Sequence, residues 1–125
     1  MARWKGTPWR VALLLAVSMA TARADDGFAV FMTQWREALV RRDAVALASL
    51  AQTPFLFDGR AQDEAGVARV VVPALITDEV RACLLDAVPV AEDDRQVLFC
   101  APYAFYLGRV AGRWRWVEFA ADGEP

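Results

Sequence analysis

The chain has 125 residues, of which 14 are lysine or arginine, 16 are aspartate or glutamate and none is histidine, giving a formal net charge of −2. Without histidine, Ser-His-Asp and Cys-His nucleophiles and histidine-ligated metal sites are excluded, so we expect no hydrolase, no metal centre and no cofactor. The acidic balance also argues against nucleic acid as a partner.

The first 24 residues have the order of a secretory signal peptide. A basic stretch at 1–10 precedes the apolar run 11–17, and Ala22-Arg23-Ala24 then supplies the small side chains that signal peptidase requires. With residues 18–20 included, the apolar stretch has about ten residues and rises only ~15 Å as a helix, too little for a ~30 Å hydrocarbon core, so we expect no membrane anchor. The sequence predicts cleavage between Ala24 and Asp25, a single mature domain at 25–125, and a periplasmic or secreted protein.

The mature domain opens with two predicted helices. Apolar residues, Trp35 among them, recur at three- and four-residue steps over 28–42, which indicates an amphipathic helix. Asp43 is a suitable N-cap for a second, shorter helix over 44–51, and Thr53-Pro54 ends it.

The next segment contains a short strand and an ambiguous stretch. Phe55-Leu56-Phe57 predicts a short strand that ends at the turn Asp58-Gly59. Acidic residues at the start of 63–75 and the spacing of its apolar residues favour a helix. The three consecutive valines at 70–72 also fit a strand, and Pro73 would interrupt either element.

Another helix is predicted from 78 to about 87. Thr77 is its expected N-cap, and acidic residues in the first turn complement the helix dipole. Its buried stripe is expected to contain Val80, Cys83, Leu84 and Ala87.

The last third of the chain predicts a meander of strands. Apolar residues indicate strands at 96–101 and 103–110, with Pro102 marking a bulge or an edge position. Ala111-Gly112 supplies a hairpin turn, and 114–120 returns as the final strand. Helices followed by a strand meander predict an α+β fold.

Cys83 and Cys100 are the two cysteines of the chain. In an exported protein the expected state is a disulfide, and closing a loop of about 18 residues would contribute ~3 kcal/mol to stability. The alternatives are two buried free thiols or a redox-active pair, and a redox pair usually has Cys-x-x-Cys spacing, which is absent.

The opening helix with Trp35 and the following Arg42-Asp43, Leu47 and Leu50 are similar to the first two helices of the nuclear transport factor 2-like superfamily. The hairpin over 112–116 resembles the glycine, tryptophan, basic, apolar ending of that family. The resemblance covers about residues 28–121. It implies a strongly curved, mainly antiparallel sheet that wraps the helices and leaves a cone-shaped cavity. The best-known enzymes of the family use histidine or paired acids there, and this chain has no histidine.

Strand alternation places Trp114, Trp116 and Glu118 on one face of the last strand. If the tryptophans point inward, Glu118 lies in the cavity, where it could serve as an acid or base. Alternatively, the strand twists or Glu118 pairs with an arginine at the mouth of the cone. Asp58 and Tyr103 are further cavity candidates, although turn chemistry and simple packing also account for them.

Two charged stretches have ordinary structural explanations. Arg113-Trp114-Arg115-Trp116 could bind nucleic acid or a membrane surface, but alternation with tryptophan inward and arginine outward predicts the same pattern. Glu92-Asp93-Asp94 lacks the spaced ligands and central glycine of a calcium loop and is expected to be a solvated turn.

The function expected from the sequence is a non-catalytic binding module of the cell envelope. It would hold a small apolar ligand or a protein partner of the envelope, and it could form a homodimer through the sheet. One alternative is a lyase or isomerase that uses Glu118 or Asp58. The other is an immunity-like or inhibitor-like envelope protein.

Overall fold

A computed structural model describes residues 27–122, so the leader and the predicted cleavage site at Ala24 and Asp25 lie outside the described residues. The described elements are α2 (Phe28–Arg41), α3 (Ala44–Ser49), β1 (Phe55–Phe57), β2 (Arg60–Gln62), α4 (Glu64–Gly66), the π-helical segment η2 (Val67–Val71), α5 (Val72–Leu75), α6 (Asp78–Asp86), β3 (Val90–Glu92), β4 (Arg95–Cys100), β5 (Tyr103–Val110) and β6 (Arg113–Ala121). This order confirms the predicted α+β class. None of the described helices is long and apolar enough to cross a bilayer.

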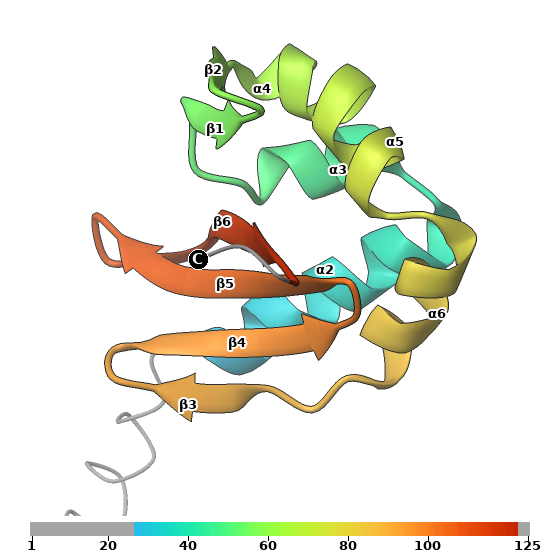
Figure 1. The fold of residues 1–125 in the computed structure, drawn as a ribbon. Helices are drawn as coiled ribbons and strands as arrows, with labels where there is room; N and C mark the ends of the chain where they lie inside the picture. The colour runs from blue at the N-terminus through green and yellow to red at the C-terminus, as the bar shows by residue number, and fades with distance from the viewer. Residues whose placement is uncertain (1–26, 123–125) are drawn as a thin grey trace, which may run out of the picture.

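The strands form two separate antiparallel sheets, one of four strands in the order β3-β4-β5-β6 and one made of β1 and β2. In Figure 1, α2 lies behind the four-stranded sheet, and no described helix covers the face turned toward the viewer. Pro102, predicted to mark a bulge or an edge, lies in the turn between β4 and β5. The two sheets do not close on each other.

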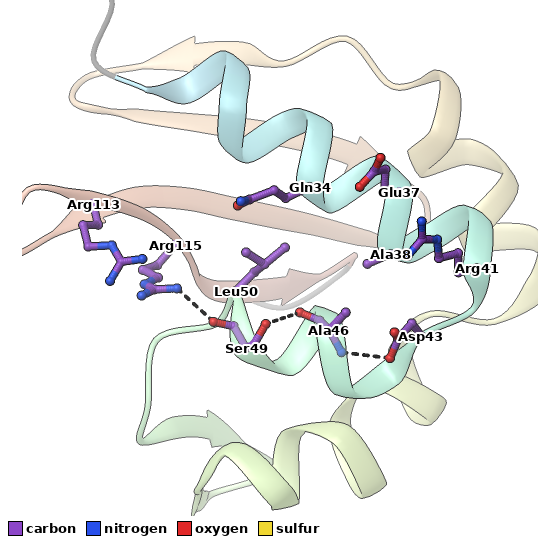
Figure 2. Close-up of a pocket in the computed structure, with 10 residues that line it drawn as sticks. All are labelled: Gln34, Glu37, Ala38, Arg41, Asp43, Ala46, Ser49, Leu50, Arg113 and Arg115. Carbon is purple, nitrogen blue, oxygen red and sulfur yellow. Dashed lines mark hydrogen bonds between the residues drawn. The ribbon is translucent and has the colours of Figure 1, made fainter.

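The first two helices begin and end where their capping residues predict. The backbone of Arg42 is left-handed, with φ of 54°, and ends α2. The side chain of Asp43 then accepts a hydrogen bond from the Ala46 N–H at 3.0 Å, which caps the start of α3. The short linker turns α3 back along α2, and this places the two helices side by side (Figure 2).

The ambiguous stretch is helical. Asp63 accepts a hydrogen bond from the Gly66 N–H at 2.7 Å and caps the start of a path that runs through α4, η2 and α5. A helical proline lacks an N–H donor and clashes with the carbonyl four residues earlier. The wide π-helical turn of η2 immediately before α5 relieves this conflict, so Pro73 remains within the helical path.

Aromatic rings from helix and sheet form the centre of the core. Trp35 of α2 and Trp116 of β6 are fully buried, and their ring centroids are 5.6 Å apart. Phe55 lies 4.7 Å and Phe105 lies 5.7 Å from Trp116. Trp114 belongs to the same core, which confirms the prediction that the three tryptophans pack together. These rings occupy the space between α2 and the sheet.

A β-bulge in β6 changes the face that the end of this strand presents. Tyr106 pairs with Glu118 while the next residue, Leu107, pairs with Trp116, so Val117 is an extra residue in β6. Strict alternation would keep Trp116 and Glu118 on one face. The bulge places them on opposite faces, and the prediction of a shared face is therefore wrong.

A disulfide joins α6 to β4, as predicted. The Cα atoms of Cys83 and Cys100 are 5.7 Å apart. Cys100 is buried, whereas Cys83 is exposed, so the prediction that Cys83 belongs to the buried stripe of its helix is wrong. Val80 and Leu84 form that stripe.

Candidate functional site

The predicted carboxylate Glu118 lies on the helix-free face of the four-stranded sheet. Its side chain is 57 % exposed and forms an ion pair with Arg95, with 3.2 Å between the nitrogen and oxygen atoms. The guanidinium of Arg95 also lies over the ring of Tyr106, 4.4 Å from its centroid. The alternative prediction, that Glu118 pairs with an arginine, is therefore confirmed, and the arginine is Arg95.

The other candidates occupy separate places. The indole of Trp116 is fully buried and donates its N–H to the carbonyl of Glu118 at 3.1 Å. Tyr103 packs edge-on against Phe105 and Phe119, with centroids 6.2 Å and 6.0 Å away. Asp58 is exposed in the β1–β2 turn, where its φ is 52°.

These placements do not assemble a catalytic centre. The side chains of Glu118 and Trp116 lie on opposite faces of β6, Tyr103 is on β5, and Asp58 is in the β1–β2 turn. Within residues 27–122, no group of three or more metal-ligating side chains occurs.

A groove lies between α2, α3 and the beginning of β6 (Figure 2). Its volume is about 450 Å³, and its polar lining is Gln34, Glu37, Arg41, Asp43, Ser49, Arg113 and Arg115. We call it the α2–α3 groove. A second hollow of about 330 Å³ continues it past Trp114 and Gly112, and the two share Gln34, Leu50 and both β6 arginines.

The charges in this groove are separated along its length. In Figure 2, Arg113 and Arg115 lie at one end, while Glu37, Arg41 and Asp43 lie at the other. Arg115 donates a hydrogen bond to the Ser49 carbonyl at 2.8 Å, which places its charge at the C-terminal end of α3. The groove therefore has a cationic end on the strand and a mixed end on the helices.

A second charged contact fixes the junction of α2 and α6. Arg42 donates a hydrogen bond to the Asp78 carboxylate. This bond and the charge of Arg42 hold the pKa of Asp78 below its ordinary value; burial acts weakly in the opposite direction, and Arg81 adds a further lowering. The contact is structural and lies outside the lining of the α2–α3 groove.

The groove was not predicted from the sequence, although the strand pattern that builds one of its walls was. Arg113 and Arg115 were interpreted as a solvated face, and they do point away from the buried tryptophans. The opposite wall comes from Gln34, Glu37 and Arg41, whose three- and four-residue spacing puts them on one face of α2. The two walls come together only because α3 packs alongside α2.

Comparisons of the chain with family models, with curated proteins and with solved structures found no match.

Proposed function

We propose that the mature chain is an exported, non-catalytic binding module of the cell envelope, and that it binds a protein partner through the α2–α3 groove. The observation that carries this proposal is the aromatic core. Trp35, Trp116 and Phe105 fill the space between α2 and the four-stranded sheet, where a small ligand or substrate would otherwise bind. Among the open hollows of residues 27–122, we assign recognition to the α2–α3 groove, which has charged groups from both helix and strand.

The character of the groove favours a protein over a small apolar ligand. Sites for small apolar ligands are concave and mostly apolar, with few polar groups. Here charged side chains such as Arg113, Arg115 and Glu37 line an open hollow. The enzyme alternative loses its main support because Glu118 is paired with Arg95 on the opposite face of the sheet.

Export and family membership belong to the same proposal. The Cys83–Cys100 disulfide and the signal-peptide pattern together support an oxidising compartment outside the cytoplasm. The inward Trp35 and the hairpin after Gly112 support a distant relationship to the nuclear transport factor 2-like superfamily, with a curved sheet around the helices.

A homodimer through the sheet remains a separate prediction. It would use the helix-free face, where Phe99 is 56 % exposed. Sedimentation of the protein and of a Phe99→Ser variant measures it directly, and a monomer in both cases would contradict it.

Site-specific photocrosslinking in exporting cells tests the binding function. A photoreactive amino acid at Gln34, in the groove, should give a defined adduct with an envelope protein. The same group at Val88, which is 78 % exposed and lies outside the groove, is the matched control and should give none. No adduct at Gln34, or equal adducts at both positions, would contradict the proposal. The proposal would also be contradicted by enzymatic turnover of any substrate, if Glu118→Gln abolished that turnover and left the stability of the protein unchanged.

A further inference from the structure

The edge of β6 is covered along part of its length only. The segment after α3 pairs with the strand in a parallel bridge, in which Trp116 donates its N–H to the Leu50 carbonyl and accepts from the Gln52 N–H, both at 2.8 Å. β6 is an edge strand of the four-stranded sheet, and beyond this bridge no other described strand pairs with its outer edge.

The main chain of Trp114 points to the same edge. In a strand, residues two apart direct their N–H and C=O groups the same way, so Trp114 follows Trp116. The main-chain groups of Arg113 and Arg115 point toward their β5 partners, Val110 and Gly108. The N–H and C=O of Trp114, which lies between them, therefore point outward, away from β5. Within the described part of the chain, no residue pairs with its outward N–H and C=O.

Two arginines flank this unpaired main chain. Arg113 and Arg115 share one face of β6, and at about 3.3 Å per residue their Cα atoms are ~6.6 Å apart, the spacing of alternate residues in any strand. The side chain of Arg113 is exposed, and within residues 27–122 its guanidinium forms no hydrogen bond or ion pair. A strand laid beside Trp114 could therefore place acidic side chains against both guanidinium groups.

We propose that the open edge of β6 at Trp114 binds an extended acidic segment of a partner protein by strand addition. The partner's main chain pairs with the Trp114 N–H and C=O, and carboxylates at alternate positions pair with Arg113 and Arg115. The rest of the segment lies in the α2–α3 groove. This inference rests on the proposed function, because it names the chemistry of the partner that the groove would bind.

A pair of short capped peptides tests the inference. One alternates glutamate with valine, and the other has glutamine in place of every glutamate. The glutamate peptide should bind the disulfide-bonded protein at least about tenfold more tightly, with a difference that shrinks as salt is added. On binding, the Trp114 amide should become protected from hydrogen exchange, as an added strand requires.

Arginine variants locate the contact. Arg113→Gln should weaken binding of the glutamate peptide by about tenfold, because it removes a charge-assisted hydrogen bond. Arg69→Gln, which changes an exposed arginine of η2, is the matched control and should bind as the unaltered protein does. Arg115→Gln should act like Arg113→Gln, once its unfolding midpoint shows that loss of the Ser49 contact has not unfolded it.

Four outcomes would overturn the inference: equal binding of the two peptides, equal weakening by the control variant, binding without protection of the Trp114 amide, or a single-stranded oligonucleotide that outcompetes the peptide. Self-association that Arg113→Gln abolishes would assign the edge to a second copy instead. If groove-specific crosslinks form at Gln34 while the acidic peptide fails to bind, the binding function stands and the acidic partner is wrong.

Discussion

The indole of Trp35 is fully buried against Phe31 and Trp116, with ring centroids 6.0 Å and 5.6 Å away. Truncating such a side chain removes its transfer free energy and leaves a cavity, so Trp35→Ala should lower the free energy of unfolding by ~3–5 kcal/mol. Thermal or urea denaturation measures this. Val40→Ala on the same helix is the control, because Val40 is 63 % exposed and should change stability by less than about 0.5 kcal/mol. Similar losses for both variants would show that α2 is not packed on the sheet as described.

A single extra residue in β6 explains why Glu118, the predicted cavity carboxylate, lies on the other face of the sheet. The alternation of tryptophan and arginine over 113–116 predicted correctly which side chains are buried. Beyond it, Val117 shifts the register by one, and Glu118 moves to the face of Arg95. A bulge depends on the pairing partner as well as on the strand's own residues, so the sequence of β6 alone could not reveal it.

Asp78 makes stability depend on pH. Its pKa is lowered in the folded protein by the hydrogen bond and charge of Arg42, so the folded state favours the ionised carboxylate. The resulting stability is present above the ordinary value of 3.8 and is lost as the pH falls through the lower pKa of the folded state. Both side chains are largely exposed, so we expect a small effect that salt reduces.

Carboxyl titration by NMR measures the effect directly. Arg42→Gln should return the pKa of Asp78 toward its ordinary value, and Asp78→Asn should remove this part of the acid-induced loss of stability. An Asp78 that titrates identically with and without Arg42 would show that the contact is absent in solution.

Among the secondary-structure elements, those with capping residues were the most predictable. Asp43 and Thr77 each accept a hydrogen bond from the backbone N–H three residues on, and both helices begin where predicted. The strands β2 and β3 were missed because each has only three residues and, unlike the equally short β1, neither contains an aromatic residue. So short a segment cannot show a pattern of alternation, and its pairing comes from the neighbouring strand.

The disulfide links the helical and sheet layers through α6 and β4. Its removal should lower stability by about 3 kcal/mol, in keeping with a sequence separation of 17 between the two cysteines. Urea unfolding with and without reductant measures this loss. The Cys83→Ala/Cys100→Ala variant is the control: it should match the reduced protein and show no response to reductant. Labelling of two thiols in the unfolded, unreduced protein would contradict the bridge.

For the whole molecule, the sequence predicted the class and the order of elements better than it predicted the binding surface. Periodicity and turns along the chain specify helices first and a meander last. The α2–α3 groove joins Gln34 and Glu37 on one helix to Arg113 and Arg115 on a strand almost 80 residues later. Such a junction is set by packing between layers, which has no local signal in the sequence.

The proposed export determines which form of the chain would meet the proposed partner. We expect the exported protein to begin at Asp25, since Ala22-Arg23-Ala24 places small side chains at the positions that signal peptidase reads. Intact-mass measurement of protein from the periplasm should show the loss of 24 residues and, with the disulfide formed, of two hydrogen atoms. A variant carrying Ala22→Leu and Ala24→Leu is the control, because larger side chains block the peptidase, and it should keep its full length in the membrane fraction. A full-length mass for the unaltered protein, or reduced cysteines in it, would contradict export. The groove would then not reach the compartment in which it is proposed to bind its partner.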